Sequence, residues 1–227
     1  MVGSDLGVGE DMLYLKPLAR DNWDVRDLLR HITPTPVQPN NLSDEQKINL
    51  IADKFTEILK VLGLNLHDDS LKDTPQRVAR MYVREIFSGL NPAHFPKISV
   101  IENKMKYEEP VLVKNIALIS TCEHHFVTIA GRAHVAYVPA KKIIGLSKIN
   151  RLVRFFARQP QVQERLTRQI ADALQLVLET DHVAVRIDAD HFCVRQRGVE
   201  DTESTTITFD YRGRFKTDSA LIGRLGL

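Results

Sequence analysis

The chain has 227 residues, with 31 lysines and arginines against 29 aspartates and glutamates, and its basic residues are spread along the sequence. This balance argues against a dedicated nucleic-acid binder, and the lack of any apolar run near 18 residues or of an apolar leader argues against membrane association. With 43% hydrophobic residues and only two cysteines, the composition is that of a globular protein of a reducing compartment, so a cytoplasmic location is expected.

The first 42 residues are expected to form an arm in front of a domain that spans residues 43–227. Residues 23–29 have the composition of a short helix, but the prolines that follow at 33–39 cannot continue one. The arm is therefore predicted to consist of a helical piece and a proline-rich linker.

Two helices are predicted at the start of the domain. Ser43 followed by Gln46 is a capping-box pattern, and apolar residues behind it recur at helical spacing as far as Gly63. The second helix begins near Thr74, where a proline suits the first turn, and ends at 88–89.

Strands are predicted in the middle and at the end of the domain. Residues 98–139 are predicted to form strands, with turns at 130–131 and at Pro139. Two further strands are expected at 182–195 and 204–211. Strands and helices that come in runs, rather than in strict alternation, favour an α+β fold with an antiparallel sheet.

Both cysteines lie beside histidines. Cys122 and His125 have two residues between them, so a thiolate and an imidazole can reach one metal ion from a single turn. His191 and Cys193 fall in a predicted strand, where alternation puts them on one face. Two sulfurs and a nitrogen, with the fourth position open, are a catalytic zinc arrangement. The alternative is two inert core thiols with surface histidines nearby.

A third helix is predicted to be capped by Ser147, with Lys148 in its first turn and Arg151 on the same side. Free backbone N–H groups, the helix dipole and two cations make an anion site there. The alternative is a plain capped helix with solvated cations. A second basic pair, Arg195 and Arg197, follows the second cysteine, and its alternative is a charge pair on an edge strand.

A fourth helix is predicted to open at Pro160. Glu164, near its start, can accept two parallel hydrogen bonds from the donors of a guanine edge. The alternative is a glutamate favoured by the helix dipole alone.

The segments STCEHHF, IGLSKINR, QPQVQERLT and HFCVRQRGV occur in this order, after DTPQRVARMYVREIFSGL. Together they resemble zinc-dependent GTP cyclohydrolase I, from about residue 44 to about residue 217. One departure is Gln196, where the family often has a methionine. The resemblance implies the tunnelling fold, in which sheets and helices of several subunits close into a β-barrel. It also implies a toroidal homo-oligomer, a decamer, with active sites shared between subunits.

The resemblance further implies a role for each site residue, with GTP as the substrate and one zinc ion per subunit. The implied zinc ligands are Cys122, His125 and Cys193. The implied catalytic residues, which transfer protons, are His124, His191 and Ser147. The residues implied to hold the triphosphate are Ser147, Lys148, Arg151, Arg197 and, from a neighbouring subunit, Arg77. The guanine is implied to bind Glu164, helped by Gln163.

The implied reaction is hydrolysis of the imidazole ring of GTP at C8, with release of formate and rearrangement to 7,8-dihydroneopterin 3′-triphosphate. This is the first step of pterin and tetrahydrofolate biosynthesis. The residue types suit it, because zinc lowers the pKa of bound water to about 7 and a histidine titrates in the range needed to protonate a ring nitrogen.

Two other hypotheses stand beside this one. A non-enzymatic zinc module that binds a nucleotide or a protein partner would need a closed four-ligand site, with His124 or His191 as the fourth ligand. Another pterin-forming or purine-binding enzyme of the same fold is the second alternative, although such enzymes lack the combined CEHH and HFC motifs.

Overall fold

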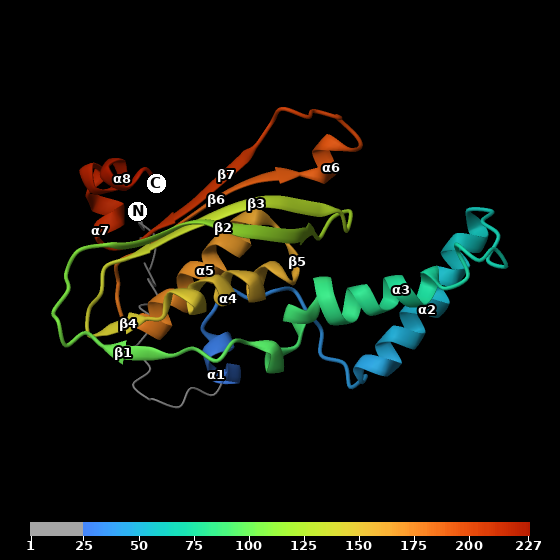
Figure 1. Ribbon diagram of the computed structural model, residues 1–227, viewed down its shortest axis with the longest axis horizontal. Coiled ribbons are helices and arrows are strands. Elements are labelled where there is room, and N and C mark those ends of the chain that lie inside the picture. Colours follow the sequence, from blue (N-terminus) through green and yellow to red (C-terminus); the bar gives the residue numbers. More distant parts are fainter. Residues whose placement is uncertain (1–24) are drawn as a thin grey trace, which may run out of the picture.

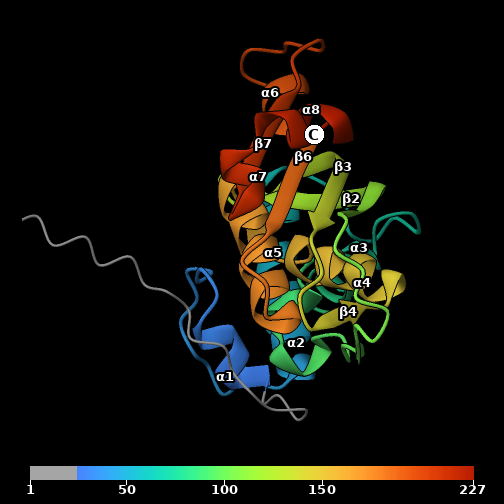
Figure 2. The ribbon, with the colours of Figure 1, turned by 90° about the vertical axis from the view of Figure 1, so that its left-hand side faces the viewer.

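The computed structural model describes residues 25–227, in which helices pack on one side of a sheet (Figures 1 and 2). This arrangement confirms the predicted α+β class. The first two residues of the helix predicted at 23–29 lie outside the described residues, and the rest of it is present as α1 (Val25–Arg30). Within the described residues, no helix is long and apolar enough to cross a membrane.

The described part of the N-terminal arm packs against the core. Leu28 and Ile32 are buried in the main hydrophobic cluster. Thr33 donates hydrogen bonds from its backbone N–H (2.8 Å) and its hydroxyl (2.7 Å) to Oδ2 of Asp172. The side-chain amide of Gln169 donates to the carbonyl of Thr33 at 2.9 Å. The segment after α1, which lies away from α7 and α8 in Figure 2, is thereby fastened to the helix that carries Asp172.

The first two helices of the domain form a pair that projects to one side (Figure 1). Helix α2 (Asp44–Val61) has the predicted capping box: Ser43 Oγ accepts from the Gln46 N–H at 3.3 Å, and Gln46 Oε1 accepts from the Ser43 N–H at 2.8 Å. Helix α3 (Thr74–Met81) continues into a π-helical turn and two 3₁₀ turns. These three turns are η1 (Tyr82–Ile86), η2 (Ser88–Leu90) and η3 (Pro92–His94).

The main sheet has five strands in the order β5-β2-β3-β6-β7. All its pairs are antiparallel except β2 with β5, so the sheet is mixed rather than purely antiparallel. The strands are β2 (Val111–Cys122), β3 (Thr128–Tyr137), β5 (Pro160–Gln161), β6 (Val183–His191) and β7 (Thr206–Tyr211). A separate two-stranded sheet pairs β1 (Val100–Glu102) with β4 (Lys142–Ile144).

The turn predicted at 130–131 is wrong, because these residues lie within β3. Gly131 is needed there for a close approach between strands rather than for a turn. A Cβ atom at this position would lie 2.1 Å from the backbone oxygen of Asp188 on β6, which no side chain tolerates. The chain instead turns at residues 123–127, which carry the histidine motif.

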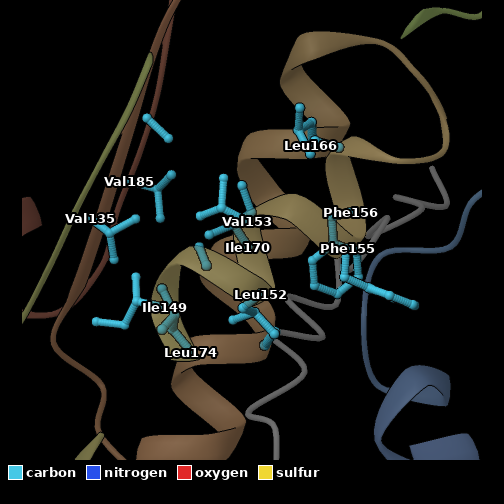
Figure 3. Packing of buried hydrophobic residues seen from close by; sticks show 14 of the residues in the cluster. Val135, Ile149, Leu152, Val153, Phe155, Phe156, Leu166, Ile170, Leu174 and Val185 are labelled. Carbon is cyan, nitrogen blue, oxygen red and sulfur yellow. The ribbon is translucent and has the colours of Figure 1, made fainter. Parts of the chain in front are cut away.

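Helices α4 (Leu146–Ala157) and α5 (Gln163–Leu178) cover one face of the main sheet. In Figure 3, Val135 and Val185 of the sheet face Val153 of α4 and Ile170 of α5, and together they form a layer of buried apolar side chains. Burial of such side chains contributes roughly 1.5–3 kcal/mol each. This layer is the main core of the described residues.

The opposite face of the sheet is covered only at one end. There, helices α7 (Arg214–Thr217) and α8 (Ser219–Leu225) bury Phe215 and Leu221 against Ala136 and Ala184. Along the remainder of this face, large apolar side chains are exposed, namely Ile119, Ile207 and Phe209. The described chain alone therefore leaves apolar side chains exposed on this face, beside the charged Arg186 and Asp188 of β6.

Two predicted helix starts are wrong. Gly145, in an extended conformation, is the N-cap of α4, and Ser147 is already helical and makes no capping hydrogen bond. Pro160 does not open a helix but pairs with β2 as part of β5, and α5 begins only at Gln163. A proline suits such a two-residue edge strand because it has no N–H to leave unpaired.

Candidate active site

The sheet topology brings the two cysteines together although they are 71 positions apart in the sequence. Strand β3 pairs antiparallel with both β2 and β6, so these two strands run in the same direction and end at the same edge of the sheet. Cys122 is the last residue of β2, His125 lies in the turn that follows, and Cys193 lies just beyond β6. Ligand atoms of these three residues all lie within 4.8 Å of one another.

The predicted strand alternation between His191 and Cys193 is wrong. Strand β6 ends at His191, and Phe192–Arg195 form the short helix α6. The helical turn places the Cys193 thiol beside Cys122, whereas the ring of His191 reaches the start of α5. The two residues therefore belong to different parts of the site.

The thiols lie among positively charged and hydrogen-bonding groups. Burial raises the pKa of the Cys193 thiol, the adjacent Cys122 raises it further, and Arg197 opposes both effects. Arg197 donates a hydrogen bond to Nε2 of His125 at 3.1 Å, and Nδ1 of His124 lies 3.6 Å from the sulfur of Cys122. Only a bound cation or nearby positive charge favours two thiolates side by side.

The donor set fits a soft divalent metal ion. It comprises two sulfurs and one imidazole, with no carboxylate, which is a ligand combination that zinc takes and that magnesium and calcium do not. Within residues 25–227 it is the only cluster of three or more such groups at bonding range.

The side chain of Gln163 fixes the orientation of His191. Gln163 is 1% exposed, and its Nε2 lies 3.0 Å from the carbonyls of Ile187 and Thr206 and 3.1 Å from the hydroxyl of Thr208. Because the amide nitrogen faces these acceptors, its Oε1 must face His191, whose Nε2 lies 2.7 Å away. Nε2 of His191 therefore carries the hydrogen, and Nδ1 keeps a free lone pair.

The surroundings of His191 favour its neutral form. Burial lowers its pKa below the ordinary value of 6.5, and the nearby carboxylates of Glu164 and Asp190 oppose this effect in part. Glu164 is exposed in the first turn of α5, where the helix dipole favours a negative charge. A carboxylate, a neutral imidazole and a metal-ligand cluster thus meet at one edge of the sheet, which is an arrangement for binding polar heterocycles and transferring protons.

The model of the family described as GTP cyclohydrolase I matches residues 51–224. The chain belongs to the GTP cyclohydrolase I family. The family prediction from the sequence motifs is thereby confirmed. The chain is 60% identical over 197 residues to GTP cyclohydrolase 1 of Vibrio cholerae, an alignment that covers 86% of this chain and 91% of that protein. It is similarly close to GTP cyclohydrolase 1 of Enterobacter sp. (60% over 185 residues; 81% and 83% covered) and of Shewanella baltica (57% over 193 residues; 85% and 89% covered).

Several residues that the resemblance to GTP cyclohydrolase I implied lie away from this edge. Ser147, Lys148 and Arg151 are in the first half of α4, which starts just after β4. That helix has 12 residues, a length of about 18 Å, and it is its other end that leads into β5 beside Cys122 (Figure 1). Arg77 is on α3, where it pairs with Asp73 at 3.3 Å.

The histidine turn is held by contacts that the sequence analysis missed. Arg165 of α5 forms an ion pair with Glu123, the residue after Cys122, and donates to the carbonyl of Pro160 at 2.8 Å. The N–H of Glu123 also donates to the carbonyl of Gln161 at 3.0 Å. Nothing in the local sequence of the turn indicates that Arg165, more than forty residues away, pairs with Glu123.

Proposed function

We propose that this chain hydrolyses GTP to formate and 7,8-dihydroneopterin 3′-triphosphate, consuming one water molecule overall, as the first step of pterin and tetrahydrofolate biosynthesis. The observation that carries the proposal is the cluster of Cys122, His125 and Cys193 within 4.8 Å, beside His191 and Glu164. The 60% identity to a protein named GTP cyclohydrolase 1 supports the same reaction.

The proposed metal is zinc, one ion per chain, held by Cys122, His125 and Cys193. When bound, such an ion supplies a nucleophile of hydroxide strength at neutral pH for attack on C8 of GTP. The alternative of a closed, non-catalytic site needs His124 or His191 as a fourth ligand. The hydrogen bond from His191 Nε2 to Gln163 argues against His191 in that role, because it holds the ring toward α5.

Proton transfer is assigned to the two other histidines of the site. The lone pair on Nδ1 of His191 can accept a proton from an attacking water, and the resulting imidazolium can return it to the ring nitrogen as the C–N bond breaks. His124 is exposed next to Cys122, so it can exchange protons with solvent. Ser147, supplied by a neighbouring subunit, is proposed to carry protons during the later rearrangement of the ribose.

Guanine recognition is assigned to Glu164, whose carboxylate can accept from both N1–H and the 2-amino group. The prediction that Gln163 assists stays a prediction, since its amide already has protein partners. The triphosphate is proposed to be bound by Arg197 of the same chain together with residues of neighbouring chains. These are Ser147, Lys148, Arg151 and Arg77.

This division of the site requires an oligomer. In one chain the start of α4 is separated from the metal cluster by about the length of that helix. The open sheet face carries three exposed apolar side chains, Ile119, Ile207 and Phe209, which a barrel of several sheets would bury. We therefore assign the chain to the tunnelling fold, assembled as a toroidal decamer, with residues 43–227 as the catalytic domain and residues 1–42 as its N-terminal arm.

The direct test is to incubate the zinc-loaded protein with GTP and to measure formate and, after oxidation, the fluorescent pterin. We expect one formate for each pterin, and loss of both products in the Cys193→Ala variant. GTP binding without formate release would contradict the proposal and favour the non-enzymatic zinc module. Formate release without pterin formation would favour a different ring-opening enzyme.

A further inference from the structure

Helix α4 carries a line of basic side chains that extends beyond the residues proposed to bind GTP. Three of them, Lys148, Arg151 and Arg154, recur at intervals of three residues on one side of the helix, and the fourth is Arg158 at its C-cap. Apolar residues of α4 point the other way, into the main core. The proposed function uses the first two cations and leaves Arg154 and Arg158 without a role.

Arg154 and Arg158 lie in a hollow of about 490 Å³ between α4 and the turns that follow α3. Two more guanidinium groups, those of Arg84 and Arg151, line the same hollow, together with polar groups of Ser88 and His94. None of the lining residues is acidic. The volume is within the roughly 300–1,000 Å³ of small-molecule sites.

The positive charge of this basic hollow is largely uncompensated by the described residues. Arg84 forms an ion pair with Glu45, outside the lining. Within residues 25–227, neither Arg151 nor Arg154 has a carboxylate within ion-pair distance. Arg158 has only the hydroxyl of Ser88, at 3.5 Å.

The positively charged guanidinium groups also repel one another. Burial lowers the pKa of Arg158, and the charge of Arg154 lowers it further, while Glu85 opposes both effects only in part. Like charges at this helical spacing destabilise a helix by a few tenths of a kcal/mol each. Such an arrangement is stabilised when an anion occupies the space between the cations.

We infer that the basic hollow binds a multiply charged phosphate anion of the di- or triphosphate class. Guanidinium groups hold phosphate oxygens through paired N–H donors, and four of them line this hollow. A neutral ligand would leave the repulsion between the arginines in place. The inference goes beyond the proposed function, because Arg84, Arg154 and Arg158 take no part in the proposed GTP site.

An anion in the hollow should weaken GTP binding, because the two sites share Arg151. Arg151 lines the hollow and is also proposed to hold the triphosphate of GTP on a neighbouring subunit. An anion in the hollow therefore competes for the same guanidinium, and we expect it to raise the KM for GTP more than it lowers kcat. The anion is either free polyphosphate or the phosphates of a nucleotide, and the two sources are distinguishable.

The test is isothermal titration of the zinc-loaded full chain with inorganic tripolyphosphate at fixed ionic strength. We expect the double variant Arg154→Gln/Arg158→Gln to raise the Kd at least tenfold. The matched control is Arg168→Gln, at an exposed arginine of α5 outside the hollow, for which we expect a change below twofold. Heat from removal of zinc by tripolyphosphate would be equal in all variants, since none alters a metal ligand.

A third variant separates the hollow from the proposed triphosphate site. Lys148→Ala should retain tripolyphosphate binding, because Lys148 does not line the hollow. Loss of binding in Lys148→Ala, with unchanged binding in the double variant, would overturn the inference. Equal affinity of the wild-type chain for tripolyphosphate and sulfate would also overturn it. Should the double variant fold poorly, the single change at exposed Arg154 serves in its place, with at least a threefold rise in Kd expected.

Two further arms complete the experiment. GTP and tripolyphosphate should displace each other because both use Arg151, and simultaneous binding of the two would contradict this competition. A lower Kd for ATP than for tripolyphosphate assigns the hollow to nucleotide phosphates, and a higher Kd assigns it to a free polyphosphate. Formate release from GTP is measured on the same samples. A chain that binds tripolyphosphate through Arg154 and Arg158 but releases no formate would reject the proposed function and leave this inference standing.

Discussion

Nε2 of His191 donates a hydrogen bond of 2.7 Å to the side-chain oxygen of Gln163. This bond joins the end of β6 to the first residue of α5. It therefore fixes the imidazole relative to Glu164, the next residue of that helix. The nitrogen that faces away from Gln163 is the one left free to accept a proton.

Replacement of Gln163 by leucine should lower kcat without a comparable change in KM for GTP. The leucine side chain has a similar size but cannot hold the His191 ring in one tautomer and orientation. A positioned acid–base group contributes about 10²–10⁴-fold to a rate, which sets the upper limit of the loss. Steady-state kinetics on a zinc-loaded variant measure the two constants separately.

Two readouts distinguish positioning from a general loss of structure. Nitrogen NMR shifts of His191 should report a hydrogen on Nε2 in the wild-type protein and a mixture of tautomers in Gln163→Leu. In Gln163→Glu the carboxylate still accepts from His191 but faces the carbonyls of Ile187 and Thr206, so stability should fall by about 1–3 kcal/mol while the tautomer is kept. An unchanged tautomer in Gln163→Leu would contradict the assigned role.

The composition of the metal cluster was predictable from the sequence, but its geometry was not. Cys122 and His125 share one turn, so local spacing was sufficient to pair them. Cys193 joins them because β2 and β6 end at the same edge, which depends on the order of strands in the sheet. Strand alternation gave the wrong relation to His191, since a short helix begins at the residue between them.

The wrong predictions of a turn and of two helix starts also arise from contacts between distant parts of the chain. The glycine at position 131 is typical of a turn. It is required instead by the close backbone of β6, almost sixty residues further along the chain. Ser147 and Pro160 are common at helix starts, but the true starts were decided by the extended backbone at Gly145 and by the pairing of β5 with β2. The partners of Gln163 on β7 are equally remote, and local patterns carry no information on them.

Cys193→Ala should remove most of the bound zinc and abolish formate release, because two protein ligands remain where three are required. Metal analysis of the purified variant measures occupancy. The matched control is His124→Asn, which leaves the three ligands in place and should retain zinc while lowering kcat by about 10²-fold or more. Full occupancy in Cys193→Ala would contradict the ligand assignment.

Glu164→Gln should raise the KM for GTP by about 5–150-fold, the equivalent of ~1–3 kcal/mol for a mispaired polar contact. An amide offers one acceptor and one unwanted donor to the two donors of guanine. Inosine triphosphate lacks the 2-amino group, so the variant should lose less affinity for it than for GTP. Equal effects on both nucleotides would show that Glu164 does not bind the guanine and acts only as a charge at the helix terminus.

His134, on the sheet face opposite the main core, should make the protein less stable in mild acid. Burial lowers its pKa below the ordinary value of 6.5, and Arg186, Lys114 and Arg132 lower it further, while Asp188 opposes them. Its Nδ1 is buried without a hydrogen-bond partner among the described residues. Since the unfolded chain takes up the proton first, this contribution to stability is complete above about pH 6.5 and decreases as the pH falls below it.

The expected result is a smaller fall of Tm between about pH 7.5 and pH 5 in His134→Gln than in the wild-type protein, measured by thermal unfolding. The side chain of glutamine does not titrate, so the variant loses this proton uptake. His67→Gln, at an exposed histidine outside the sheet, is the control and should follow the wild-type curve. Parallel curves for all three proteins would show that His134 contributes nothing to the pH dependence.

Subunit mixing tests the shared site. Lys148→Ala damages the half of the site at the start of α4, and Cys193→Ala damages the half at the sheet edge, about one helix length away in the same chain. Each variant alone should be inactive or nearly so. In assemblies re-formed from equal amounts of both, random association gives about a quarter of the sites two intact halves, so about a quarter of wild-type activity should return.

The control mixture is Cys122→Ala with Cys193→Ala, in which both changes damage the same half and no activity should return. Native mass measurement verifies subunit exchange and the size of the assembly. Exchange without rescue in the first mixture, or a fully active monomer, would contradict the shared site and with it the proposed decamer.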